Sequence, residues 1–161
     1  MDLGATTALV ARVTLAAAFG LSAATKAMAP AEFARAVRDF GVPAPGLVAR
    51  VLPPVEAGLA VLLVAVRGSA WPAYVAIVVL GGLTAAVIAN LAGGVRAPCP
   101  CFGPAPAGAR PVSAATVARN GALIALAVLG AAPTVGASAG WSAAASVVTV
   151  TATLVALRRV G

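Results

Sequence analysis

The 161-residue sequence predicts an all-α integral membrane protein, a single membrane domain over residues 1–161 with a four-helix core and a fifth transmembrane helix. Hydrophobic residues make up 61% of the chain and charged residues 9%, whereas a soluble domain carries about 25% charged residues. Five apolar segments approach the roughly 20 residues that cross a bilayer. Because every backbone polar group must be bonded internally in hydrocarbon, segments of this length are expected to be helices.

The predicted transmembrane helices follow one another along the chain. They cover residues 5–26, 47–66, 72–91 and 114–131, which form the core over about 5–132, and an additional C-terminal helix at about 139–157. The segment Ala27-Met28-Ala29 would also suit a cleaved signal peptide. We expect the first helix to be retained, because the chain begins without a positive region and Arg12 interrupts the apolar stretch.

Between the first two segments lies a short amphipathic stretch. Phe33, Val37 and Phe40 recur at helical spacing and form one apolar stripe, with charged residues on the other face. Pro30 suits a helix start and Gly41 its end. A helix lying in the membrane interface is expected, either as a solvated connector or as a functional flap.

The net charge of +7 does not indicate a nucleic-acid-binding protein. The eleven Lys and Arg residues stand at the ends of apolar runs, without a basic stripe or interleaved aromatic residues. Attraction to anionic lipid headgroups accounts for them more simply. We therefore expect the lipid bilayer, and no nucleic acid, as a partner.

Both cysteines of the chain, Cys99 and Cys101, flank Pro100 in one loop. A disulfide at this spacing is tight and strained, which makes it exchangeable rather than structural. The loop precedes a helix N-terminus that would favour a thiolate. Thiol–disulfide exchange is the leading interpretation, with Cys101 as the lower-pKa thiol, Cys99 as its resolving partner and Arg119 stabilising the thiolate. Inert or lipid-bearing thiols and a soft metal ion are the alternatives; no metal is expected, because histidine is absent.

Glu56 lies near the middle of the second predicted span, where a carboxylate is costly and marks a pairing or functional site. It is interpreted either as half of a structural ion pair or as a proton carrier. Two asparagines, Asn90 and Asn120, could bond between helices or to a ligand. The candidate partners of Glu56 are Lys26, Arg12, Arg50 and Arg119.

The sequence resembles the MauE family of methylamine-utilisation membrane proteins, within the DoxX-like group. The resemblance covers roughly residues 8–132 and rests on several features in order: Lys26, Phe33 and Phe40, the Pro53–Glu56–Gly58 pattern, the C-x-C-F-G loop of Cys99, Cys101, Phe102 and Gly103, and Arg119-Asn120. It departs from the family core by the fifth span. Candidate catalytic residues are Cys99, Cys101, Glu56 and Arg119, and candidate cofactor contacts are Asn120, Phe102 and Lys26.

The resemblance implies a membrane thiol–disulfide redox protein, a thiol-disulfide oxidoreductase if it is an enzyme. Such a protein passes electrons between a thioredoxin-like partner and a membrane acceptor, such as a quinone, and supports disulfide maturation of exported proteins. In the namesake system the matured protein is methylamine dehydrogenase. The alternatives are a non-enzymatic scaffold or assembly subunit with a structural C-x-C loop, and a small-solute or metal transporter.

The expected location is the plasma membrane of a bacterium, as a multi-pass protein. Five spans place nine of the eleven Lys and Arg residues on the side of the cysteines, leaving Arg12 and Arg67 on the other. This distribution favours cytoplasmic cysteines. Disulfide chemistry and the resemblance favour the opposite side, because oxidised thiols persist outside the cytoplasm. We expect an extracytoplasmic cysteine loop.

Overall fold

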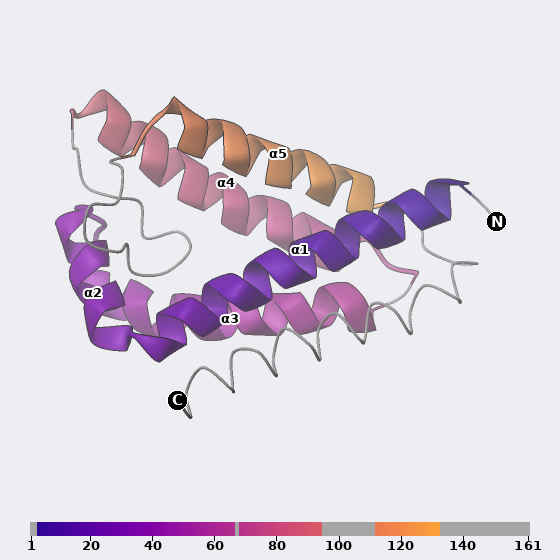
Figure 1. Ribbon diagram of the computed structural model, residues 1–161, viewed down its shortest axis with the longest axis horizontal. Coiled ribbons are helices and arrows are strands. Elements are labelled where there is room, and N and C mark those ends of the chain that lie inside the picture. Colours follow the sequence, from indigo (N-terminus) through magenta and orange to yellow (C-terminus); the bar gives the residue numbers. More distant parts are fainter. Residues whose placement is uncertain (1–2, 67, 95–111, 133–161) are drawn as a thin grey trace.

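The computed structural model describes residues 3–66, 68–94 and 112–132, and all regular elements in these ranges are α-helices (Figure 1). The prediction of an all-α membrane bundle is thereby confirmed. The helices are α1 (Leu3–Met28), α2 (Pro30–Asp39), α3 (Pro45–Ala65), α4 (Trp71–Ala92) and α5 (Ala114–Gly130).

The long helices form two layers. α1 packs mainly against α3, and α4 packs mainly against α5, while α1 also contacts α5 and so joins the layers. The short helix α2 lies across one end of the bundle and packs on α3. This arrangement leaves one end occupied by α2 and the other by the C-terminal ends of α3 and α5 (Figure 1).

The boundaries predicted for the four core helices agree with the structure to within two residues at every end. In the described part of the chain, α1, α3 and α4 are long and apolar enough to cross a membrane, and α5 is a shorter apolar helix of 17 residues. The fifth predicted helix, at 139–157, lies outside the described residues.

Prolines begin three of the helices. They occupy the first turns of α2, α3 and α4, where the missing N–H has no helical partner in any case. Two further prolines, Pro53 and Pro54, lie inside α3, which continues through them to Ala65. α2 ends before Gly41, whose φ of +72° is readily adopted only by residues without a Cβ atom.

The core between the layers consists of apolar and small side chains. Ideal placement of a Cβ atom on Gly20 of α1 brings it 3.9 Å from the Cβ of Ala60 on α3, so these two helices approach closely. Small residues at a helix interface permit such packing in membranes. The central cluster of buried residues is Leu15, Ala16, Phe19, Leu59, Ala60, Leu63, Ala76, Leu80 and Ala127.

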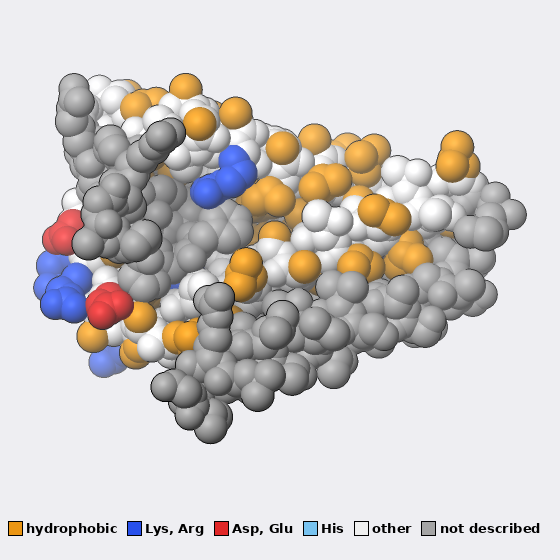
Figure 2. All heavy atoms as spheres, in the orientation of Figure 1, with side chains coloured by type: hydrophobic (Ala, Val, Ile, Leu, Met, Phe, Trp, Pro, Cys, Tyr) orange, Lys and Arg blue, Asp and Glu red, His pale blue; other side chains and the backbone are white. Residues whose placement is uncertain are grey.

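The amphipathic prediction for α2 is confirmed. Phe33, Val37 and Phe40 are buried, and the charged residues of the helix are exposed at this end of the molecule (Figure 2). Phe40 also packs with Val87 of α4 and Val112, which precedes α5. The α2 end of the bundle therefore joins both layers through an apolar cluster and carries charges on its outer surface.

The opposite end is held by a buried arginine. Arg12 of α1 is fully buried, and its Nε donates to the carbonyl oxygen of Gly130 at 2.7 Å. Its Nη1 donates to the carbonyl oxygen of Val66 at 2.7 Å, and its Nη2 donates to that of Ser69. Since helix C-termini present carbonyls without intrahelical partners, one guanidinium caps the ends of α3 and α5 together.

Candidate functional site

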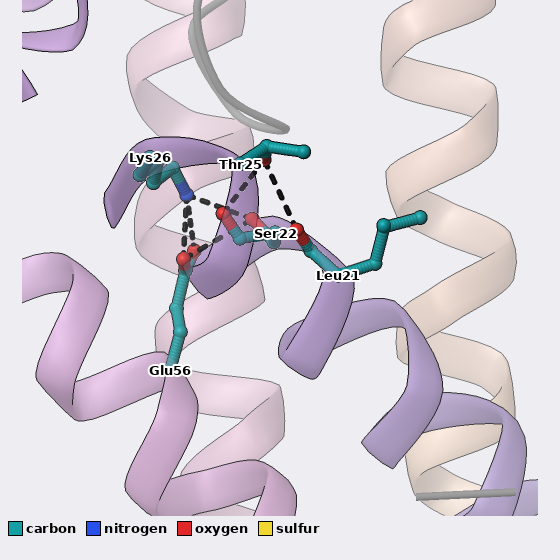
Figure 3. A network of polar contacts seen from close by, with 5 residues as sticks. All are labelled: Leu21, Ser22, Thr25, Lys26 and Glu56. Carbon is teal, nitrogen blue, oxygen red and sulfur yellow. Dashed lines mark hydrogen bonds and ion pairs between the residues drawn. The ribbon is translucent and has the colours of Figure 1, made fainter. Parts of the chain in front are cut away.

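A buried ion pair joins α1 to α3 (Figure 3). The Nζ of Lys26 lies 2.6 Å from both Oε1 and Oε2 of Glu56. It also donates to the Oγ of Ser22 at 2.8 Å, and that hydroxyl donates to Oε2 of Glu56 at 3.1 Å. The three side chains are between 0% and 2% exposed, so the network is closed off from the surroundings of the bundle.

The geometry of the network follows from helical spacing. Ser22 and Lys26 are four residues apart on α1 and therefore share one face, which is turned to α3. Glu56 stands on the facing side of α3, one turn from the close contact at Ala60. Thr25 turns away to the backbone and donates to the carbonyl oxygens of Leu21 and Ser22 (Figure 3).

The structure selects one of the four predicted partners of Glu56. Lys26 makes the pair, and its ammonium group bonds to the carboxylate of Glu56. Arg12 binds carbonyls at the far end of the bundle. Arg50 and Arg119 are exposed on α3 and α5. The role of Ser22 was missed, although its i, i+4 spacing from Lys26 on an apolar helix was a usable signal.

Phe33 of α2 covers the ion pair. Its ring centroid lies 5.3 Å from the Nζ of Lys26, within the range of a cation–π interaction. Phe33 is 1% exposed. α2 thus shields the pair at the end of α1, and the charged outer face of the bundle is separated from the buried charges by one aromatic ring.

A narrow, partly open cleft runs between the two layers beside the ion pair. Its lining is mostly apolar and comes from four helices, with three polar side chains among them: Leu15, Ala18, Phe19, Ser22, Glu56, Leu80, Leu83, Asn120 and Leu123. We call this feature the interlayer cleft. It brings Asn120, predicted as a ligand contact, into one lining with Glu56.

Asn120 is 1% exposed, and among the residues that the structure describes neither its Nδ2 nor its Oδ1 has a hydrogen-bond partner. Leaving a buried polar group unsatisfied costs about 1–3 kcal/mol. Asn90 of α4 differs, because its Nδ2 donates to the carbonyl oxygen of Ala86 at 3.0 Å. The two asparagines predicted as ligand or interhelical contacts therefore differ: Asn90 is bonded to its own helix, and Asn120 is buried in the lining of the cleft.

Cys99, Cys101 and Phe102 lie outside the described residues. The described residues end at Gly94, just past α4, and begin again at Val112. Val112 packs with Phe40 in the apolar cluster at the α2 end of the bundle. Arg119 is exposed on α5 and is not part of the cleft lining. The cysteine segment is thus attached at the end of the bundle where α2 lies.

Comparison with known families identifies the chain. The family model described as methylamine utilisation protein MauE matches residues 4–133, and the chain belongs to this family. No curated protein and no solved structure matches it. Together with the apolar helices, the family assignment shows a membrane protein whose described core, α1 to α5, coincides with the matched region.

Proposed function

We propose that this MauE-family protein is a membrane thiol–disulfide oxidoreductase that acts through Cys99 and Cys101. Its substrate is a thioredoxin-like protein on the outer side of the plasma membrane, and its acceptor is a quinone in the bilayer. It thereby supports disulfide formation in exported proteins, among them proteins of methylamine utilisation, the process in the family's description.

The proposed reaction balances in two steps. The Cys99–Cys101 disulfide accepts two electrons and two protons from a partner dithiol, which becomes a disulfide. The resulting pair of thiols then returns two electrons and two protons to a quinone, which becomes a quinol. Because the first step is exchange between sulfurs, it requires a disulfide that opens easily, and the C-x-C spacing provides the strain for this.

One observation carries the proposal: the segment with both cysteines is attached at the same end of the bundle as the buried ion pair. Gly94 and Val112 bound the segment, and Val112 packs against Phe40, at the end of the helix that covers Lys26 and Glu56. In this proposal Glu56 transfers protons, and Arg119 stabilises the Cys101 thiolate that is released when the partner attacks the disulfide. A polar, buried network at the end of the bundle where the cysteine segment is attached suits proton-coupled chemistry.

The test uses Cys99→Ser and Cys101→Ser in the full chain, reconstituted in vesicles that contain a quinone. We expect each variant to lose oxidation of an added reduced thioredoxin by at least about a hundredfold, because the chain has only two cysteines and the remaining one cannot form the intramolecular disulfide. The exposed Glu32→Gln variant is the control and retains the wild-type rate. Equal rates in the cysteine variants would disprove the proposed reaction.

A scaffold or assembly subunit is the second candidate, and the ion pair favours it. Both oxygens of Glu56 bond to Lys26, and Ser22 completes the network, so the pair is satisfied without a ligand. Such a pair can serve to fix helix register alone. Under this alternative the cysteine variants keep both partner binding and the maturation of exported proteins.

A further inference from the structure

Asn120 is the one polar side chain of the interlayer cleft that has no hydrogen-bond partner among the residues that the structure describes. Its Nδ2 and Oδ1 have no accessible surface, so a molecule from outside does not reach the amide. Unsatisfied buried polar groups are rare in folded proteins. A partner for Asn120 therefore has to come from the neighbouring side chains of the bundle.

Two other polar side chains line the cleft, Ser22 of α1 and Glu56 of α3. Lys26 binds both of them, because its Nζ lies 2.8 Å from the Oγ of Ser22 and 2.6 Å from each carboxylate oxygen of Glu56. Glu56 thus contacts Lys26 and also borders the cleft, whose lining extends to Asn120 of α5. Of the two polar neighbours, Glu56 is the one whose donors and acceptors change when it takes up a proton.

The two protonation states of Glu56 require different partners. An ionised carboxylate only accepts hydrogen bonds, and the ammonium group of Lys26 is a donor that matches it. A protonated carboxyl group has one donor and one acceptor, and a primary amide offers both kinds of group as well. Such a carboxyl group can donate to an amide oxygen and accept from an amide nitrogen. The neutral form of Glu56 is therefore complementary to the amide of Asn120.

The cleft has room for the carboxyl group to turn between these partners. Its free volume is about 10 Å³, which is room for about one water molecule, so the rotation of a side chain fits there. When Glu56 turns away, Lys26 keeps its bond to Ser22 and its contact with the ring of Phe33, whose centroid lies 5.3 Å from Nζ. The ammonium group is therefore still held when the carboxylate has left it.

Among the described residues, Lys26 is the one charged group that faces Glu56. The other cation of α1 with a described side chain, Arg12, binds carbonyls at the far end of the bundle. The charged residues of α2 are exposed on its outer face, and α4 contributes only leucine side chains to the lining. Arg50 of α3 and Arg119 of α5 are exposed and do not line the cleft. Protonation of Glu56 is therefore balanced against its pairing with Lys26.

We propose that Asn120 is a positioning residue for proton transfer: it binds the protonated form of Glu56, whereas Lys26 binds the ionised form. Uptake of one proton converts the carboxylate to a carboxyl group, which leaves the ammonium group and hydrogen-bonds to the amide. Release of that proton restores the ion pair. The two binding positions stand on the contacts given above. Only their part in proton transfer rests on the proposed function, in which Glu56 carries protons between the thiols and the quinone.

Infrared difference spectroscopy of the full chain in phosphatidylcholine nanodiscs, recorded during a pH titration, tests this inference. The chain has four Asp and Glu residues, and the C=O stretching band of protonated Glu56 is identified by its loss in Glu56→Gln. In Asn120→Leu we expect this band to move to higher frequency, because the carboxyl group loses its hydrogen bonds to the amide. The midpoint of its titration should move to lower pH by about one unit, since the amide stabilises the neutral form by about one hydrogen bond.

Two further variants make the result specific to the amide. Asn120→Ser keeps a smaller polar group at the same position and should shift the band less, which also preserves the test if Asn120→Leu fails to fold. Asn90→Leu is the matched control, because Asn90 bonds to the carbonyl oxygen of Ala86 and does not line the cleft. Its band and midpoint should equal those of the wild type.

The proposal is wrong if the band position and the midpoint are unchanged in both Asn120 variants. It is also wrong if no Glu56 band appears at any pH at which the chain stays folded, because Glu56 would then never be neutral.

The spectra and the oxidation assay separate this inference from the proposed function. A chain that carries Cys99→Ser and Cys101→Ser together is expected to show the wild-type Glu56 band, because Lys26, Glu56 and Asn120 are unchanged. A band shift in Asn120→Leu, without thioredoxin oxidation by the wild-type chain, would support the two positions of Glu56 and refute the redox role. Thioredoxin oxidation with a Glu56 band that Asn120→Leu does not alter would refute this inference alone.

Discussion

At the scale of single residues, three buried charges organise the part of the chain that the structure describes. Arg12, Lys26 and Glu56 are each 0% or 1% exposed. A charge removed from water is tolerated only when it is paired or fully hydrogen-bonded. Lys26 and Glu56 satisfy each other, and Arg12 is satisfied by three backbone carbonyls. Each charge thus connects segments distant in sequence.

The ion pair should be strongly coupled. Lys26→Met leaves Glu56 buried without its partner, and we expect the free energy of unfolding to fall by about 3–5 kcal/mol. The double variant Lys26→Met/Glu56→Leu replaces both charges by apolar groups and is expected to cost less than Lys26→Met alone. Unfolding in mixed micelles measures the free energy of unfolding of each variant, with the exposed Glu32→Gln as control. Additive effects of the two substitutions would contradict the direct pairing.

Arg12 should matter through its shape as well as its charge. Arg12→Lys retains one positive charge, but an ammonium group cannot replace the planar guanidinium that donates to three carbonyl oxygens. We therefore expect the free energy of unfolding to fall by at least about 2 kcal/mol. Arg50→Lys, at an exposed position of α3, serves as the matched control and should change stability by less than about 0.5 kcal/mol. Similar losses of unfolding free energy in both variants would mean that Arg12 does not cap the two helices.

The sequence predicts which charged residues are energetically unfavourable in a membrane span, but not which residues they pair with. Glu56 stands out because a carboxylate in a membrane span needs a partner. Four basic residues were candidates, and the choice of Lys26 depends on the way α1 faces α3, which hydropathy does not encode. The capping role of Arg12 was likewise invisible, because its acceptors belong to backbone groups more than fifty residues away.

At the scale of elements, helix boundaries were predictable because they depend on local signals. Prolines at helix starts, Gly41 after α2 and the length of the apolar runs determine where helices begin and end. The packing partners depend on contacts between small residues, such as Gly20 with Ala60. Since Ala and Gly are abundant throughout the chain, their positions alone do not single out the α1–α3 contact.

The close approach of α1 and α3 can be tested at Gly20. A Cβ atom at this position meets Ala60 at an ordinary contact distance of 3.9 Å, so we expect Gly20→Ala to be tolerated. Gly20→Leu overpacks the interface and should cost about 1–3 kcal/mol of unfolding free energy. Gly58→Leu, where an added Cβ meets nothing within 4 Å, is the control. Equal stability of the two leucine variants would argue against close packing at Gly20.

Helix α2 should be needed for the integrity of the ion-pair end. Phe33→Ala removes a buried ring that contacts Lys26, and we expect the free energy of unfolding to fall by about 3–5 kcal/mol. Ala31→Gly, at an exposed position of the same helix, is the control and should cost about 1 kcal/mol or less. Comparable losses in the two variants would mean that Phe33 does not anchor α2.

At the scale of the whole molecule, the two ends of the bundle differ in their construction. One end is closed by Arg12 across the ends of α3 and α5. The other end carries α2, the buried ion pair and both attachments of the cysteine segment, Gly94 and Val112. In the proposed function, this second end performs thiol exchange on the outer side of the membrane.

Thiol labelling in intact cells that express the full chain reports the side and the redox state of the two cysteines. Cells are treated with a membrane-impermeant maleimide before and after mild reduction, and again after lysis. We expect labelling of Cys99 and Cys101 in intact cells only after reduction, which means an outward-facing disulfide. Labelling that needs lysis but no reductant would place reduced thiols in the cytoplasm and contradict the proposed redox function.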